Sequence, residues 1–207
     1  MKRFNQYCPI AHALELVGER WALLIVRELV NGPRRYTDLA AQLPRIGTNI
    51  LAGRLRDLEA GGIVRKHRLP PPAASQVYEL TEYGQGLKPV LHALAHWGAR
   101  SLGPPDADTE LRPGWLENAL CVGVSLAATG GNFEFRIGDE TASLVDGEVR
   151  AGPVESPDAV VEADARGFFH LFVHGRFDGV SVEGDRAALE RLVKTVVVLR
   201  EPETVPA

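Results

Sequence analysis

A stretch rich in glycine, proline and acidic residues, from Ser101 to Glu110, divides this 207-residue chain into two regions of opposite charge. Residues 1–103 carry 14 Lys and Arg against 8 Asp and Glu, a net charge of +6, and the remainder carries 9 against 19, a net charge of −10. A stretch of this composition is typical of an interdomain linker. We therefore expect two domains, at residues 1–103 and 112–200. The basic domain suits a polyanionic partner and the acidic domain does not.

Several classes of protein are disfavoured by what the sequence lacks. It has no apolar run of about eighteen residues, and residues 1–10 do not resemble a secretory leader, so we expect a cytoplasmic protein that does not bind a membrane. Cys8 and Cys121 lie far apart without a Cys-x-x-Cys pattern, which excludes a disulfide framework and a cysteine-rich zinc module. The common nucleophile and phosphate-loop motifs are missing, and we expect neither an enzyme nor a cofactor.

Two pairs of histidines are spaced so that each pair can share one face of a helix: His92 with His96, and His170 with His174. A protein metal site normally needs three or four ligands, and no zinc-protease signature accompanies either pair. We therefore expect no metal site.

The first region has mainly helical patterns followed by a hairpin. Trp21, Leu24, Ile25 and Leu29 form an apolar stripe with helical period that stops at Asn31-Gly32-Pro33. Further along we expect helices at 36–43, 49–60 and 81–100, with Thr48 and Thr81 marking the starts of the last two, and a hairpin of strands 63–69 and 76–80.

The order of helix, helix, capped helix and basic hairpin predicts a winged helix-turn-helix, in which the second helix of the turn enters the major groove of DNA. At about 100° per residue, Leu51, Leu55 and Leu58 share one face of helix 49–60 and should pack inward. The opposite face carries two side chains that can pair with base edges and two small residues that let the backbone approach the groove closely: Asn49, Arg56, Ala52 and Gly53.

Basic side chains around this helix are suited to the phosphate backbone or the minor groove. Arg54 lies between the two faces, and we assign it to a phosphate or to an internal ion pair. The alternative for any single arginine is an ordinary solvated side chain. The residues that we expect at the DNA are Arg34, Arg35, Arg45, Thr48, Asn49, Gly53, Arg56, Arg65, Lys66 and Arg68.

Five segments of the first region resemble the HxlR-type (MarR-like) winged-helix transcription regulators. They are Cys8 to Gly18, Arg20 to Leu29, Gly32 to Leu39, Leu55 to Val64 and Tyr78 to Gly84. The resemblance covers nearly all of residues 5–100. It implies a homodimer joined through the first and last helices of the region, with two recognition helices on a palindromic operator. The alternative for His92, Leu94, Ala95 and Trp97 is a helix packed within one subunit.

Cys8 lies at the position where several members of that family carry a thiol that senses oxidants or electrophiles. It precedes Pro9 at an expected helix start, where the helix dipole favours a thiolate. The alternative is an inert, small apolar residue.

The acidic region mixes helical and strand patterns and predicts an α+β domain. Helices are expected at 115 to about 127, 165–174 and 186 to about 197, and strands at 132–137, 142–149 and 159–163 and around Val180 and Val182. The overall fold class is therefore α+β, a winged helix-turn-helix followed by a sheet covered by helices.

This second region resembles the sterol carrier protein type-two-like domain over residues 112–198. The resemblance rests on Phe133 to Ile137, Asp146-Gly147, Pro157 to Ala163, Gly175 to Asp178 and Val182 to Asp185. It implies an apolar tunnel for a hydrophobic molecule. Its candidate lining is Trp115, Leu120, Phe133, Phe135, Phe168, Phe169 and Phe172, for which an ordinary filled core is the alternative.

Together these features predict a homodimeric regulator of transcription that binds operator DNA and responds to a hydrophobic effector, with a repressor favoured and an activator as the alternative. One alternative is a thiol-based sensor acting through Cys8, with a purely structural second domain. Another is a lipid carrier, which does not explain the basic first domain.

Overall fold

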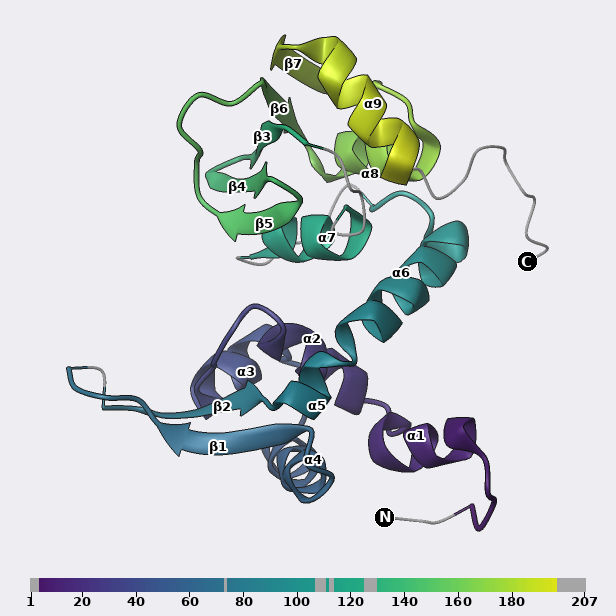
Figure 1. Ribbon diagram of the computed structural model, residues 1–207, viewed down its shortest axis with the longest axis vertical. Helices are drawn as coiled ribbons and strands as arrows, with labels where there is room; N and C mark the ends of the chain where they lie inside the picture. The colour runs from purple at the N-terminus through teal and green to yellow at the C-terminus, as the bar shows by residue number, and fades with distance from the viewer. Residues whose placement is uncertain (1–3, 73, 107–110, 112–113, 125–129, 197–207) are drawn as a thin grey trace. The chain divides into compact units, whose positions relative to one another are not determined.

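The computed structural model describes residues 4–72, 74–106, 111, 114–124 and 130–196. The chain divides into two compact units, Met1–Leu91 and His92–Ala207, and the division falls within one helix (Figure 1). Within the described residues, none of the helices has the length and apolar character needed to cross a membrane.

The N-terminal unit consists of helices around a two-stranded antiparallel hairpin (Figure 1). Its elements are α1 (Pro9–Val17), α2 (Ala22–Leu29), α3 (Tyr36–Gln42), α4 (Thr48–Ala60), β1 (Val64–Arg68), β2 (Gln76–Leu80), α5 (Glu82–Gln85) and the start of α6 (Lys88–Leu102). Helices α2, α3 and α4 and the hairpin follow the expected order, so the helix-turn-helix with its wing is confirmed. For α1, the sequence predicts only the start, at Pro9.

The core of this unit lies between α2, α4 and the base of the hairpin. Ile25 and Leu29 of α2 are completely buried, and so is Leu51 of α4, while Leu55 and Leu58 are 1% exposed. These residues recur at helical spacing, and burying each such side chain contributes about 1.5–3 kcal/mol. The inward face that the sequence predicts for α4 is therefore confirmed.

The single helix expected from Thr81 to Arg100 is wrong, because the chain forms two helices there. Helix α5 spans Glu82–Gln85 and ends at Gly86, and α6 begins at Lys88. Pro89 occupies the first turn of α6, where its missing N–H costs no hydrogen bond. Pro89 thus lies at the start of a helix rather than inside one.

Helix α4 begins one residue earlier than expected. Gly47 is its N-cap, and Thr48, which we expected to cap the helix, is its first residue. The backbone of Gly47 accepts hydrogen bonds from the N–H groups of Ile50 and Leu51. Glycine is acceptable at an N-cap because little stability separates it from the side chains that cap helices.

Thr81 joins three parts of the N-terminal unit. Its Oγ1 accepts a hydrogen bond from the N–H of Gly84 at 3.0 Å and so caps α5, and it donates to the carbonyl of Gly62 at 2.6 Å. Its backbone N–H donates to the carbonyl of Ile63, and the N–H of Ile63 donates to the carbonyl of Leu58 in α4. The end of α4, the start of β1 and the end of β2 are therefore hydrogen-bonded together.

The C-terminal unit contains a five-stranded sheet in the order β5-β4-β3-β6-β7, with only the β3–β6 pair parallel. Its elements are α7 (Trp115–Gly123), β3 (Asn132–Ile137), β4 (Glu140–Val145), β5 (Glu148–Ala151), β6 (Ala159–Ala163), α8 (Ala165–His174), β7 (Val180–Gly184) and α9 (Arg186–Val196). The expected α+β class is confirmed. Residues 125–129 and 197, which include the expected ends of α7 and α9, lie outside the described residues.

The strand expected over 142–149 is wrong, since two strands form a tight hairpin there. Val145 of β4 pairs with Glu148 of β5, and Asp146 and Gly147 form the two-residue turn with φ of 51° and 83°. Positive φ at both positions is what a type I′ hairpin turn requires. The Asp-Gly pair interrupts an apolar alternation that otherwise continues.

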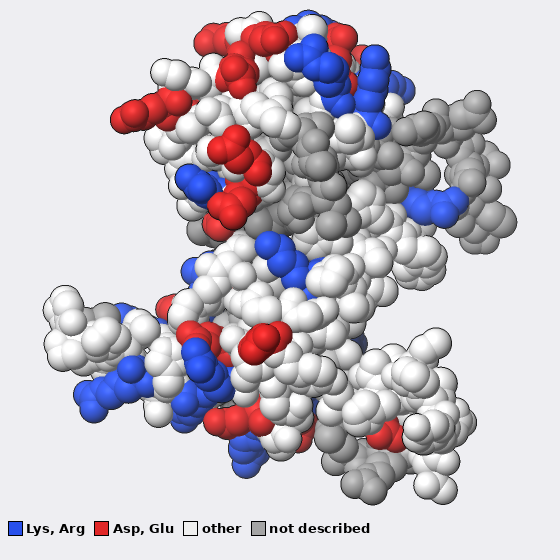
Figure 2. Space-filling view, in the orientation of Figure 1, with Lys and Arg blue, Asp and Glu red and all other residues white. Residues whose placement is uncertain are grey.

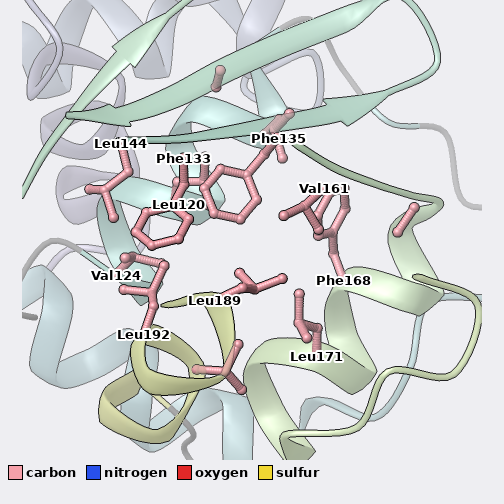
Figure 3. Close-up of a cluster of buried hydrophobic side chains, with 14 of the residues drawn as sticks. Leu120, Val124, Phe133, Phe135, Leu144, Val161, Phe168, Leu171, Leu189 and Leu192 are labelled. Atoms are coloured by element: carbon pink, nitrogen blue, oxygen red, sulfur yellow. The ribbon is translucent and has the colours of Figure 1, made fainter. Parts of the chain in front are cut away.

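The core of the C-terminal unit lies on one face of this sheet (Figure 3). Alternate strand residues point into it, among them Phe133 and Phe135 of β3, Leu144 of β4 and Val161 of β6, all at most 1% exposed. Helices α8 and α9 contribute Phe168, Leu171, Leu189 and Leu192, and α7 contributes Leu120. The helices thus bury the apolar face of the sheet.

Candidate DNA-binding surface

Helix α4 separates its apolar and polar side chains onto different faces. Leu51, Leu55 and Leu58 are buried, whereas Asn49 and Arg56 are exposed. Ala52 and Gly53 are half-buried, and a methyl group added at Gly53 would meet no atom within 4 Å. The exposed face therefore combines polar groups with open space beside the backbone.

The two arginines in the middle of α4 have different surroundings. Arg54 forms ion pairs with Asp57 at 3.0 Å and Glu19 at 3.7 Å, so it joins α4 to the segment before α2. Arg56 is exposed, and its Nε donates to the carbonyl of Ala52 in its own helix at 3.3 Å. Only Arg56 of the two projects from the face that also carries Asn49.

Three more of the expected DNA-contacting arginines lie around the turn. Arg35 is exposed and is the N-cap of α3, where its N–H donates to Asp38 Oδ2 at 2.9 Å. Arg45 is exposed between α3 and α4. Arg34 is half-buried, and its backbone forms a bridge to Tyr78 through hydrogen bonds of 2.9 Å and 2.8 Å. Arg34 thus extends the wing by one position beside β2.

The basic residues of the wing lie on two faces. Arg65, Lys66, His67 and Arg68 pair in register with Glu79, Tyr78, Val77 and Gln76. Because side chains alternate along a strand, Lys66, Arg68 and Tyr78 share one face, and Arg65, His67 and Glu79 share the other. Lys66 Nζ lies 5.5 Å from the centre of the Tyr78 ring. In Figure 2, blue side chains gather over the wing and α4.

The guanidinium of Arg65 forms an ion pair and a hydrogen bond with Glu79 Oε1. Nε2 of His67 lies 3.7 Å from Oε2 of the same carboxylate. The side chain of Glu79 is only 17% exposed, while that of Arg65 is 66% exposed. The carboxylate is therefore the more enclosed member of a pair on the surface of the wing.

Comparison with known proteins also indicates a helix-turn-helix protein. The family model described as HxlR-like helix-turn-helix matches residues 16–106. YodB of Bacillus subtilis strain 168, an HTH-type transcriptional regulator, is 35% identical over 107 residues, which are 51% of this chain and 96% of that protein. The chain belongs to the HxlR family.

Other relatives match the same half of this HxlR-family chain. YvaP of Bacillus subtilis strain 168 is 31% identical over 105 residues, which are 50% of this chain and 97% of that protein. A solved structure of the reduced form of YodB covers 49% of this chain and 100% of that one, with 34% identity and a TM-score of 0.42. The family match ends at residue 106, so it does not extend over the sheet of the C-terminal unit.

Several of the exposed large apolar side chains of this HxlR-family chain lie on α1 and α6. Ile10 and Leu14 of α1 are 72% and 50% exposed, and Tyr7 just before it is fully exposed. On α6, Trp97 is 73% exposed and Leu94 is 43% exposed, whereas His92 is buried. Cys8, at the N-cap of α1, is half-buried, and its carbonyl accepts a hydrogen bond from His12 at 3.0 Å.

Six of the seven residues expected to line an apolar tunnel lie in one cluster of the C-terminal unit. Leu120, Phe133, Phe135 and Phe168 are buried, and Trp115 and Phe172 pack against them at its margin. The Phe168 and Phe172 rings stack with centres 6.0 Å apart. Phe169 lies on another side of α8, with its ring centre 5.3 Å from that of His174. The tunnel itself stays a prediction.

The histidine pair on α8 has contacts that do not favour metal binding. Arg176 lies 2.9 Å from Nδ1 of His170, so that nitrogen accepts from a guanidinium, whereas a metal bound at Nε2 would leave Nδ1 to donate. Burial lowers the pKa of His174, and the charges of Arg176 and His170 lower it further. Within the part of the chain that the structure describes, no three His, Cys, Asp or Glu side chains are grouped to hold a metal ion.

Sequence patterns alone missed two contacts at the candidate surface. The pairing of Arg65 with Glu79 follows from the hairpin register, which the sequence predicts only through its loop length. Tyr36 of α3 donates a hydrogen bond to the carbonyl of Thr48 at 2.8 Å. The tyrosine is part of the segment that resembles the family, but nothing in its local pattern points to α4.

Proposed function

We propose that this chain is a DNA-binding regulator of transcription that binds a palindromic operator as a homodimer, with α4 in the major groove. The observation that carries this is the division of α4 into a buried leucine face and an exposed face with Asn49 and Arg56. Arginine and asparagine are the side chains that pair bidentately with guanine and adenine. The winged helix-turn-helix order and the family membership support the same function.

The contacts with DNA are of two kinds, those that read bases and those that fix the position of the protein. Asn49 and Arg56 contact base edges, with Gly53 allowing close approach of the backbone. Lys66, Arg68 and Arg34 contact phosphates from one face of the wing, and Thr48, Arg35 and Arg45 contact phosphates beside the turn. Contacts of the second kind strengthen binding to every sequence.

Two arginines of one helix provide the test. Arg56→Ala should lose discrimination between operator and scrambled DNA, because a bidentate base contact contributes about 1–3 kcal/mol of discrimination. Arg54→Ala is the matched control, since Arg54 is already held by Asp57 and Glu19. Binding is measured by fluorescence anisotropy on a fragment from upstream of the gene across a salt series. Equal selectivity of Arg56→Ala and the parent protein would show that α4 does not read bases.

The exposed apolar residues of α1 and α6 support the homodimer. Ile10, Leu14, Leu94 and Trp97 are each at least 43% exposed. Large exposed apolar side chains that gather on particular helices mark protein interaction surfaces. A C2 dimer built on these helices gives two copies of α4, as a palindromic operator requires.

Regulation by a hydrophobic effector rests on the aromatic cluster of the C-terminal unit. Phe172 is only partly buried and stacks on the buried Phe168, so the cluster reaches the surface there. To regulate DNA binding, an effector must bind more tightly to one of two protein states that differ in their affinity for DNA. Titration with dodecanoate tests this: a saturable change in operator affinity supports the effector, and no change at saturating dodecanoate contradicts it for this class of ligand.

Regulation through Cys8 is the second route. Its place at the N-cap of α1, beside the exposed apolar residues of that helix, would couple modification of the thiol to the dimer. Treatment with diamide should then weaken operator binding by the parent protein. It should not change operator binding by the Cys8→Ser variant. Equal responses of both proteins would argue against Cys8.

A further inference from the structure

The wing contains one enclosed carboxylate between two basic side chains. Glu79 of β2 lies opposite Arg65 of β1 in the hairpin register and pairs with its guanidinium. His67, two residues further along β1, brings Nε2 to 3.7 Å from the other carboxylate oxygen. The Glu79 side chain is 17% exposed, so its charge is held close to these groups.

The other face of the wing has a different composition. Lys66, Tyr78 and Arg34 stand in one row across the hairpin, because Lys66 pairs with Tyr78 on one side and Arg34 forms its bridge to Tyr78 on the other. Lys66 lies over the tyrosine ring rather than beside a carboxylate. The wing therefore presents one face with paired charges and one face whose charged side chains are all basic.

We propose that Glu79 is a specificity-determining residue: by holding Arg65, it limits the attraction of the wing to DNA of any sequence. This inference rests on the proposed function. Glu79 then weakens DNA binding, whereas the basic residues around it strengthen it. Arg65, which the sequence places among the phosphate contacts, then contributes less to DNA binding than Lys66.

A cation released from its ion pair contributes differently to non-specific and to operator complexes with DNA. Non-specific binding is essentially electrostatic, and the protein can adopt whichever register lets each cation reach a phosphate. On the operator, base contacts from α4 fix a single register, so a released Arg65 gains a phosphate only if that register provides one. Releasing Arg65 should therefore strengthen non-specific binding more than operator binding.

The size of the effect follows from the exposure of the pair. Exposed ion pairs contribute little, so Glu79→Gln should tighten binding to scrambled DNA by about two- to fivefold. One additional phosphate contact should make the salt slope steeper by about 0.9. The ratio of operator to scrambled affinity should fall by nearly the same factor.

The experiment measures both affinities by anisotropy for the full-length protein at about pH 8, where histidines are ordinarily neutral. The variants are Glu79→Gln, Arg65→Gln and the double variant, with thermal unfolding to verify the fold. Glu82→Gln is the matched control, since Glu82 is an exposed carboxylate three residues further along the chain. If Glu79 acts through Arg65, its substitution has no effect in the Arg65→Gln background.

A parent protein that does not select the operator contradicts the proposed function, and the inference is then rejected with it. A selective parent whose Glu79→Gln variant keeps the same ratio overturns the inference alone. An effect that persists in the double variant, or that Glu82→Gln reproduces, shows general repulsion of DNA and also overturns it.

Discussion

The hydroxyl of Tyr36 in α3 donates a hydrogen bond to the backbone carbonyl of Thr48, 2.8 Å away, at the first residue of α4. The two helices of the turn are thus joined directly beside Asn49. A helix that reads base edges must begin at a fixed place, because its first turn carries many of the contacts.

Tyr36→Phe should therefore affect DNA binding more than folding. A single exposed hydrogen bond contributes about 0.5–1.5 kcal/mol, so we expect a loss of unfolding free energy at the low end of this range. We expect a severalfold loss of operator affinity, because the first turn of α4 is less well fixed. Anisotropy and urea unfolding measure the two effects. Tyr83→Phe, at an exposed tyrosine of α5, is the control and should change neither.

Gly53→Ala should have opposite effects on stability and on DNA binding. A methyl group at Gly53 meets no atom within 4 Å, and alanine stabilises a helix interior by about 0.5–1 kcal/mol relative to glycine. If this face lies in the groove, the same methyl group hinders close approach and weakens operator binding. Thermal unfolding and anisotropy are compared for one preparation. A more stable protein with undiminished operator affinity would place Gly53 away from the DNA.

Gly84→Ala should destabilise the N-terminal unit. A Cβ at Gly84 would lie 2.1 Å from the carbonyl oxygen of Ile63, and the backbone there cannot move without disturbing the hydrogen bonds of Thr81. Overpacking of this kind costs about 1–3 kcal/mol. Urea unfolding measures the loss, and Gly53→Ala is the internal reference for the same substitution in open space. Unchanged stability would mean that this contact relaxes at little cost.

Trp97→Lys should separate the proposed dimer into monomers. Trp97 is 73% exposed on α6, and a charge placed in an apolar interface is costly unless it is paired. Sedimentation equilibrium should show a lower mass, and operator affinity should fall because one recognition helix is lost. Tyr83→Lys is the control, since Tyr83 is 61% exposed on α5 rather than on α1 or α6. A dimer that survives Trp97→Lys would exclude this side of α6 from the interface.

His174 should titrate below the ordinary histidine value. Burial lowers its pKa most, followed by the charges of Arg176 and His170. The unfolded chain then binds a proton at higher pH than the folded chain, so the contribution of His174 to stability is present above about pH 6.5 and is lost as pH falls below it.

An NMR titration of the His174 ring gives its pKa directly. In Arg176→Gln the pKa should rise only part of the way to the ordinary value, because burial remains the larger cause. A complete return to the ordinary value would identify Arg176 as the main cause instead.

The sequence predicts the elements of this fold where the pattern is local and strong. Leu51, Leu55 and Leu58 show the helical period that α4 uses, and Asp164, which accepts from the N–H of Gly167, caps α8 as an aspartate at this position should. The pattern fails where a short turn ends an element, as the pair Asp146-Gly147 does between β4 and β5. It also cannot show pairs such as Arg65 and Glu79, because these depend on strand register rather than on spacing along the chain.

The hydrogen bonds of Thr81 have a mechanical consequence for regulation. Together with the bond from Ile63 to Leu58, they join the C-terminal end of α4 to the base of both strands of the hairpin, so α4 and the base of the wing are held to one another. In the proposed homodimer, a regulatory signal would therefore act on α4 and the base of the wing together rather than on the wing alone. We expect it to change the distance or the angle between the two copies of α4, beginning at α1 and α6, the helices proposed to join the subunits.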